Sequence, residues 1–357
     1  MGNDIIKELE IPRISSTKVD SYQASLKTFF LKHLDPLSVE SLRWMDSNTD
    51  DDIPEIKQAD SGLVNTHRIN DIRYVNKFFE KVNREMENDR YFVIVLETMH
   101  SRRKRILNKF PRVISYPYYV LDFILKRVLP KTKPTRKIYF AITKGRNRVI
   151  SLTEALGRLT CCGFEIIAYQ SVGYHTCIIT RKVKPPAYDM QPTYGALVKL
   201  NRIGRNGKFF RVYKVRTMYP YSEYLQDYVF DKFDLEQGGK IRNDFRMTTW
   251  GSFLRKYWLD ELPMFINFFM GDMKLVGVRP LSEHYFNLYP EDLRMMRIIT
   301  KPGLIPPYYA DMPNGLEEIQ ASERRYLEQY NKHPIRTDLK YLGKVFINIA
   351  FRGARSK

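Results

Sequence analysis

The sequence predicts an α/β protein in which a degenerate Rossmann-like α/β domain precedes a mixed α+β domain with amphipathic surface helices. Three observations predict this class. The chain has 357 residues, enough for two ordinary hydrophobic cores. Helical and strand-like patterns alternate along its first half, and a segment with three prolines, residues 184–195, breaks the periodicity on both sides. We therefore expect one domain of unknown role over residues 1–185 and a second over residues 186–357.

Alternation of helix and strand is clearest in two parts of the first domain. Apolar residues at helical spacing predict a helix over residues 69–87, and the apolar run RYFVIVLET, residues 90–98, predicts a buried strand. Residues 152–183 are typical of a helix that stops at Gly163, followed by two strands that turn at Gly173. The arrangement resembles the back half of a class I methyltransferase, but no glycine-rich loop follows an early strand, as adenosylmethionine binding would require.

Positive charge is concentrated in one window of the first domain. The chain carries a formal net charge of +19, and residues 102–148 hold fifteen Lys or Arg against one acid, Asp122. This concentration indicates an anionic partner: a phosphate-rich ligand, nucleic acid, or the cytoplasmic face of a membrane. Because the window contains no nucleic-acid recognition motif, we do not expect nucleic acid as a partner.

Residues 113–130 are strongly apolar and aromatic but include Asp122, Lys126 and Arg127. The segment is too short and too charged to span a bilayer. Its basic flanks suit a helix that lies among lipid headgroups. A core helix of the N-terminal domain fits the same pattern, and the sequence alone does not choose between the two.

The three cysteines, Cys161, Cys162 and Cys177, have neither metal-ligand spacing nor the spacing of a disulfide framework. The first residues, MGNDIIKELE, lack the apolar stretch of a signal peptide. We therefore expect a cytoplasmic protein. Residues 113–130 and their basic flanks lead us to expect that it associates peripherally with the inner face of the cytoplasmic membrane.

A basic turn opens the second domain, in the stretch LNRIGRNGKFFRVYKVRTM, residues 200–218. Gly204 and Gly207 would let the backbone approach a ligand closely. Lys214 and Arg216 could meet phosphate oxygens, arginine through paired hydrogen bonds. A plain basic hairpin explains the same stretch.

The sequence LDELP places two adjacent acids, Asp260 and Glu261, before Pro263 and the apolar segment 264–270. Proline favours the first turn of a helix, so we expect the acids at a helix N-terminus, where the dipole would keep a carboxylate ionised. Mg²⁺ commonly binds one or two carboxylates together with substrate phosphates, so the pair could hold it. Helix-capping acids are the simpler explanation.

Five blocks occur in order over most of residues 192–312: RIGRNGKFFRVYKVRTM, NDFRMTTWGSFLRK, LDELPMFIN, GDMKLVGVRP and KPGL. In their order and spacing they resemble the bacterial sugar transferases, the monotopic phosphoglycosyl transferases that begin polysaccharide synthesis on a polyprenyl carrier. The resemblance implies initiation of exopolysaccharide, capsule or lipopolysaccharide synthesis.

The resemblance also implies a mechanism. Asp260 would attack the β-phosphorus of a nucleotide diphosphate sugar, usually a UDP-sugar, and polyprenyl phosphate would then attack the covalent intermediate. Glu261 would be the second acid of the dyad, handling a metal ion or a proton, with Mg²⁺ as the expected cofactor. The side chains expected at the substrate phosphates are Arg279, Lys214, Arg216, Arg246 and Arg255. The expected supporting residues are Asp244, Gly204, Gly207 and Asp272.

The sequence departs from the family in two places. Members carry a long apolar hairpin just before the RIG block, whereas this chain has GYHTCIITRKVKPPAYDMQPTYGALVKL, residues 173–200. We expect residues 113–130 and their basic flanks to contact the membrane instead. KPGLIPPYYADMP, residues 301–313, stands where the family usually continues Pro-Gly-Ile-Thr-Gly, so the identity of the sugar does not carry over. Both departures leave an alternative open: a catalytically impaired membrane-surface scaffold or regulator of polysaccharide synthesis.

Overall fold

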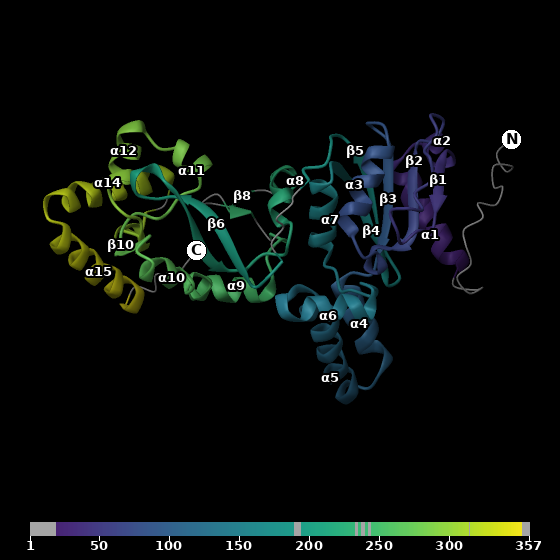
Figure 1. Ribbon diagram of the computed structural model, residues 1–357, viewed down its shortest axis with the longest axis horizontal. Coiled ribbons are helices and arrows are strands. Elements are labelled where there is room, and N and C mark those ends of the chain that lie inside the picture. The colour runs from purple at the N-terminus through teal and green to yellow at the C-terminus, as the bar shows by residue number, and fades with distance from the viewer. Residues whose placement is uncertain are drawn as a thin grey trace. The chain divides into compact units, whose positions relative to one another are not determined.

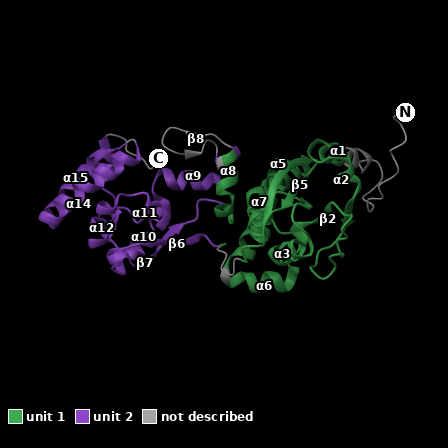
Figure 2. Cartoon of the chain, turned by 90° about the horizontal axis from the view of Figure 1, so that it is seen from above, with its two compact units in different colours: residues 1–194, 220–231 green, residues 195–219, 232–357 purple. Residues whose placement is uncertain are grey.

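The computed structural model describes residues 19–188, 194–232, 235–236, 240–241, 244–313 and 315–351. The chain divides into two compact units (Figure 2). Unit 1 comprises Met1–Tyr194 and Pro220–Asp231, and unit 2 comprises Gly195–Tyr219 and Lys232–Lys357. Part of the proline-rich segment expected between the domains, residues 189–193, lies outside the described residues.

A five-stranded mixed sheet forms the centre of unit 1, in the order β1-β2-β3-β5-β4. The first three strands run parallel, and β5 is antiparallel to both β3 and β4. The α/β class and the hairpin expected at Gly173, where φ is +62°, are therefore confirmed. The strands are β1 (Leu42–Met45), β2 (Gly62–Arg68), β3 (Tyr91–Leu96), β4 (Phe164–Val172) and β5 (His175–Lys182).

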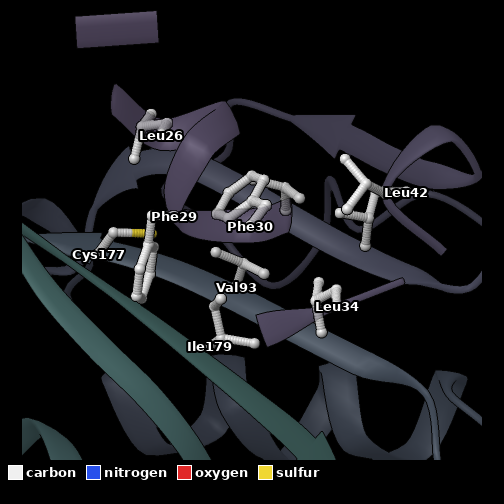
Figure 3. Close-up of a cluster of buried hydrophobic side chains, with 10 residues drawn as sticks. Leu26, Phe29, Phe30, Leu34, Leu42, Val93, Cys177 and Ile179 are labelled. Carbon is white, nitrogen blue, oxygen red and sulfur yellow. The ribbon is translucent and has the colours of Figure 1, made fainter. Parts of the chain in front are cut away.

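One face of this sheet is covered by α1 (Val19–His33), which is followed by the short helix α2 (Pro36–Glu40). Figure 3 shows the rings of Phe29 and Phe30, on α1, against Val93 of β3. All three side chains are buried in one apolar cluster. Because successive residues of a strand face opposite sides, β3 is buried on both faces, as its continuous apolar run predicted.

The opposite face packs against α3 (Val75–Glu85), where the Phe79 ring lies 5.8 Å from that of Phe92 on β3. The helix α7 (Leu152–Cys161) contacts both α3 and β4. The helix expected over residues 69–87 begins later than predicted, since Ile69–Asp71 form a separate 3-10 turn.

Three helices lie together beyond the sheet in unit 1: α4 (Met99–Lys109), α5 (Arg112–Phe123) and α6 (Lys133–Thr143) (Figure 1). A π-helical segment, Ile124–Val128, continues α5. Most apolar side chains of α5 and this segment are exposed, up to 86% for Val113. The alternative of a core helix at residues 113–130 is therefore wrong. The exposed apolar side chains are Val113, Ile114, Tyr116, Tyr118, Val120, Leu121, Ile124, Leu125 and Val128.

Residues 220–231 belong to unit 1 although they lie within the C-terminal half of the sequence. Their 3-10 turn Ser222–Leu225 packs against α7 and leads into α8 (Gln226–Lys232). A Cβ atom on Gly157 of α7 would lie 2.2 Å from the Tyr221 carbonyl oxygen. Only glycine permits this close approach.

Unit 2 combines small sheets with short helices, as a mixed α+β domain should. Its long hairpin pairs β6 (Leu197–Ile203) with β7 (Phe209–Val215) in antiparallel register. The acids Asp260 and Glu261 belong to a 3-10 turn, Leu259–Glu261. The remaining strands are β8 (Leu235–Glu236), β9 (Lys240–Ile241), β10 (Lys274–Val276) and β11 (Gly303–Ile305). The helices are α9 (Thr249–Lys256), α10 (Met264–Phe269), α11 (Glu283–Asn287), α12 (Glu291–Ile299), α13 (Tyr308–Asp311), α14 (Leu316–Lys332) and α15 (Pro334–Phe351).

The core of unit 2 is built around Tyr326 of α14 and Tyr341 of α15, whose rings meet edge to face at 5.0 Å. The C-terminal helix α15 thus packs against the domain through this face. Phe346 and Phe351, on the same helix, are exposed. Within the described ranges, no helix combines the length and apolar character needed to cross a bilayer.

Candidate active site

The 3-10 turn that carries Asp260 and Glu261 is separate from α10. Trp258 enters this turn with φ +56°, and its Nε1 donates to the Tyr309 hydroxyl at 2.7 Å. Pro263 caps α10 rather than beginning its first turn. The two acids, expected at a helix N-terminus, thus lie directly before α10 in a 3-10 turn of their own, and the turn anchored by Trp258 sets their position.

A buried amide, Asn267, fastens α10 to the hairpin strand β7. Its Oδ1 accepts from the Tyr213 N–H at 3.1 Å, and its Nδ2 donates to the Arg211 carbonyl oxygen at 2.8 Å. The predicted supporting residue Asp272 accepts from the same Nδ2 at 3.3 Å. Because Lys214 follows Tyr213 on the strand, these bonds hold it in register with the turn that precedes α10.

Two basic side chains converge on Glu261. The Lys214 Nζ donates to its Oε1 at 2.6 Å, and the Arg279 guanidinium lies 3.6 Å from the same oxygen. The Arg279 Nη1 also donates to the Tyr308 hydroxyl at 3.0 Å. The structure thus brings together two of the predicted phosphate ligands and the second acid of the dyad.

Asp260 is the more deeply buried acid, with 7% of its surface exposed. Burial raises the pKa of its carboxyl above the usual value and the Glu261 charge acts in the same direction, while Lys214 and Arg255 act against them. The cations Lys214 and Arg255 therefore favour the ionised form of this carboxyl against the effect of burial.

Two further arginines, Arg255 and Arg246, were predicted to contact the substrate phosphates. Arg255 donates through Nε to the Thr217 hydroxyl at 3.0 Å. Burial lowers its guanidinium pKa, which the Asp260 and Asp244 charges partly offset. Arg246 is buried and paired with Asp244 through two hydrogen bonds of 2.8 Å, one from Nε and one from Nη2. Of these two arginines, Arg255 acts on Asp260, whereas Asp244 neutralises Arg246.

Comparison with known proteins decides what kind of domain holds this cluster. Residues 186–352 match the family described as bacterial sugar transferase. The C-terminal half of the chain belongs to this family. Asp260, Glu261 and the cations around them all lie inside the matched transferase domain.

Three relatives illustrate the similarity of this transferase domain to known proteins. The galactosyl transferase CpsE of Streptococcus agalactiae is 32% identical over 148 residues, covering 41% of this chain and 33% of the relative. The undecaprenyl-phosphate galactose phosphotransferase of Salmonella typhimurium is 26% identical over 283 residues, 78% of this chain and 54% of the relative. The UDP-galactose-lipid carrier transferase of Erwinia amylovora is 31% identical over 144 residues, 39% and 28% respectively.

The chain therefore spans between about a quarter and about half of the length of these relatives. The Salmonella alignment is longer than the whole transferase domain, so its similarity extends into unit 1. The other two alignments are shorter than that domain.

Three predicted residues, Gly204, Gly207 and Lys214, lie on the transferase hairpin, and Arg216 follows it directly. Gly204 and Gly207 are at its turn, where Gly207 has φ +70°, and six residues separate Gly207 from Lys214. At the usual rise of a strand, that separation is roughly 20 Å. Arg216 donates through Nε to the Gly195 carbonyl oxygen at 2.9 Å. The structure thus places the turn glycines far from the dyad, and phosphate binding at the turn stays a prediction.

Sequence reasoning missed three aromatic residues at the site: Trp258, Tyr308 and Tyr309. Tyr308 and Tyr309 come from the segment that departs from the family pattern, and their rings lie 4.6 Å apart. Burial raises the pKa of the Tyr308 hydroxyl, so it stays protonated beside Arg279. The signal available in the sequence was the aromatic pair directly after Pro306 and Pro307, but its partners could not be read from spacing.

The carboxylates suited to a divalent ion are Asp260 and Glu261. Across the described ranges, no group of three or more His, Cys, Asp or Glu side chains has the arrangement of a metal site. Mg²⁺ commonly takes one or two protein carboxylates and completes its shell with water and substrate phosphates. The pair therefore fits an ion that arrives with a diphosphate better than an ion held by the protein alone.

Apolar side chains are exposed on both elements that flank the dyad. The Trp250 side chain of α9 is 75% exposed and that of Phe269 on α10 is 82% exposed. Exposed apolar groups in such number indicate a surface that meets an apolar partner. The members of this set are Trp250, Phe253, Tyr257, Leu262, Phe265, Ile266, Phe269 and Met270.

Proposed function

We propose that this protein transfers a sugar 1-phosphate from a nucleotide diphosphate sugar to a polyprenyl phosphate and so begins the synthesis of a polysaccharide. The observation that carries the proposal is a buried carboxylate, Asp260, beside Glu261 and the cations Lys214, Arg255 and Arg279. Phosphoryl transfer depends mainly on positioning and on cations that neutralise developing charge. Membership of the transferase domain in its family supports the same reaction.

In the first step an Asp260 carboxylate oxygen forms a bond to the β-phosphorus of the donor. The bond from that phosphorus to the bridging oxygen breaks, and nucleoside monophosphate leaves with the electron pair. In the second step an oxygen of polyprenyl phosphate attacks the same phosphorus and restores the Asp260 carboxylate. Covalent catalysis of this kind divides one difficult displacement into two easier ones.

The neighbouring side chains have separate roles in this proposal. Lys214 and Arg255 favour the ionised form of Asp260 that can attack, against the effect of burial. Arg279, held by Tyr308 and Glu261, is available to the phosphate oxygens of the donor. Mg²⁺ held by Asp260, Glu261 and the diphosphate would supply charge neutralisation. We expect a UDP-sugar as donor, because the Erwinia relative is named for UDP-galactose.

Membrane contact forms part of the same proposal. The exposed apolar side chains of α9 and α10 suit the hydrocarbon of a polyprenyl acceptor. In unit 1, α5 has exposed apolar residues and basic neighbours, the features of a helix that binds a membrane surface. We propose that α5 takes the place of the family's apolar hairpin, on the inner face of the cytoplasmic membrane. Unit 1 itself remains, in our proposal, a degenerate Rossmann-like domain.

Nucleoside monophosphate release tests the proposal. The full chain is incubated with a panel of nucleotide sugars, with and without detergent-solubilised polyprenyl phosphate, and with Mg²⁺ or EDTA. We expect release from a UDP-sugar that needs Mg²⁺, with continuous turnover only when the acceptor is present. Absence of release across the panel, with lipid binding intact, would favour the impaired scaffold or regulator instead.

A further inference from the structure

A cavity in unit 1 lies beyond the carboxyl ends of the parallel strands β2 and β3. Its volume is about 460 Å³. Residues 73–77 line it and follow β2 closely, and residues 148–150 line it from the other side. Asn70 links these segments through hydrogen bonds. Its Nδ2 donates to the carbonyl oxygen of Arg148 and to that of Glu97, which follows β3. Ligands of open α/β sheets bind outside the carboxyl ends of parallel strands.

Positive charge dominates the lining of this cavity. Eight of its side chains are cationic and one, Glu154, is acidic. The cations come from α3, α6, α7 and the segments between them, so the fold assembles them from distant parts of the sequence. They are Arg73, Lys77, Lys126, Lys131, Arg136, Lys137, Arg148 and Arg158.

Glu154, the one acid of the lining, already forms ion pairs with three cations. Glu154, only 1% exposed, lies 2.6 Å from Lys131, 2.6 Å from Arg127 and 3.0 Å from Arg158. Burial alone would raise the pKa of its carboxyl, but the three cations outweigh burial and hold that pKa well below the usual range. Burial and the nearby Arg127 charge lower the pKa of Lys131. One carboxylate cannot neutralise the other cations of the lining, so the cavity retains uncompensated positive charge.

Two buried hydrogen-bond donors also lack acceptors. The Nε atoms of Arg148 and Arg158 have no hydrogen-bond partner in the described part of the chain. The Arg158 side chain is deeply buried, with 6% of the residue exposed. A buried donor without an acceptor is costly, and a bound anion would remove that cost. Burial also lowers the pKa of Arg148 to about 10, a shift that a bound anion would oppose.

We propose that this cavity binds a phosphate-bearing anion. Arginines recognise phosphate oxygens through paired, charge-assisted hydrogen bonds, and the lining supplies four of them with four lysines. The volume is in the range of small-molecule sites, which favours a compact ligand over a polymer. The phosphate can belong to a soluble compound or to a lipid headgroup, and both present the same oxygens. The inference goes beyond the transfer reaction, since every lining residue lies in unit 1.

Hydrogen exchange of the full chain, followed by mass spectrometry, locates the bound anion. The soluble probes are pyrophosphate and uridine monophosphate, and the lipid probe is a vesicle containing phosphatidylglycerol. The readout is slowed exchange in peptides covering residues 126–158, which separates this cavity from the transferase site. Two variants remove cavity charge: the double variant Arg136→Gln with Lys137→Gln, and Lys126→Gln. Lys32→Gln, an exposed lysine of α1, is the matched control.

We expect at least one probe to slow hydrogen exchange in residues 126–158. The apparent dissociation constant should be about tenfold larger in each cavity variant and unchanged in the control. Arg136 and Lys137 are exposed and form no ion pair within the described ranges, so their replacement should leave the fold intact. Protection by soluble probes identifies a free phosphate compound, and protection by vesicles alone identifies a headgroup. No protection with any probe, or protection equal in all variants, would overturn the proposal.

Discussion

Both units place cations around a glutamate, but the two clusters differ in what the acid can still do. In unit 2, Glu261 meets Lys214 and Arg279 while a second acid, Asp260, lies beside it. In unit 1, Glu154 meets three cations and no second acid lines the cavity within the described residues. The first cluster thus holds the carboxylate that we propose as the nucleophile, and the second holds surplus positive charge.

The difference also appears in the pKa shifts of the central acids. Burial is the larger effect on Asp260 and raises its pKa, whereas cations are the larger combined effect on Glu154 and lower its pKa. A carboxylate used as a nucleophile must remain basic, and a carboxylate that organises arginines must remain ionised. We therefore expect substitutions at Asp260 to affect turnover and those at Glu154 to affect stability.

The largest expected effect is that of Asp260→Asn on turnover. An amide cannot form the covalent intermediate, so nucleoside monophosphate release should fall by about a thousandfold or more. The free energy of unfolding should not fall, because burial disfavours the charge of Asp260. Glu317→Gln, at an exposed acid of α14, is the control. Normal release by Asp260→Asn would remove Asp260 from the mechanism.

Glu154→Gln should cause the next largest effect, on stability. Removing the acid leaves Lys131 and the buried Arg127 and Arg158 without their carboxylate, which should lower the free energy of unfolding by about 3–5 kcal/mol. Glu261→Gln, at a partly exposed pair, should cost only about 1 kcal/mol. Urea denaturation of both variants measures the contrast. An equal loss of unfolding free energy in the two variants would contradict the proposed difference between the clusters.

A smaller effect is expected on pH dependence. The Lys214 charge lowers the pKa of Asp260, so Lys214→Met should raise that pKa. Because the ionised form reacts, the acidic limb of kcat/KM should move to higher pH. Lys332→Met, an exposed lysine of α14, should leave the limb in place. A limb that stays fixed or moves to lower pH in Lys214→Met would contradict the assigned role.

The smallest predicted effect concerns membrane binding by α5. Replacing Val120 and Leu121 with Ser removes apolar surface that would enter the headgroup region, so sedimentation with anionic vesicles should weaken about tenfold. Leu37→Ser, at an exposed leucine of α2, is the matched control. Equal weakening in the control, or a wild-type protein that does not bind vesicles at low salt, would rule out α5 as the membrane contact.

Local features of the fold could be predicted from the sequence because they depend on short-range patterns. Gly163 and Gly173 adopt positive φ where the helix stop and the hairpin were expected. The two acids of the proposed dyad were identified through ordered motifs. The residues that hold these acids in place were not identified, because the hydrogen bond from Trp258 to Tyr309 joins residues far apart in the chain and depends on tertiary packing.

The basic window, residues 102–148, also shows what could not be predicted from the sequence alone. Its composition predicted an anionic partner, but its one acid, Asp122, is paired with Arg102 through two hydrogen bonds of 2.7 Å. Three cations of the cavity, Arg73, Lys77 and Arg158, lie outside the window altogether. Charge density therefore predicted an anionic partner, and the fold was needed to locate the cavity that we propose for it.

Intact-protein mass spectrometry with donor alone tests the central claim most directly. Without polyprenyl phosphate, the covalent first step should stop after one turnover. The account predicts a mass increase of one sugar-phosphate group, located on the peptide that contains Asp260 and absent from Asp260→Asn. Turnover that requires the acceptor from the outset, with no adduct on the protein, would contradict it.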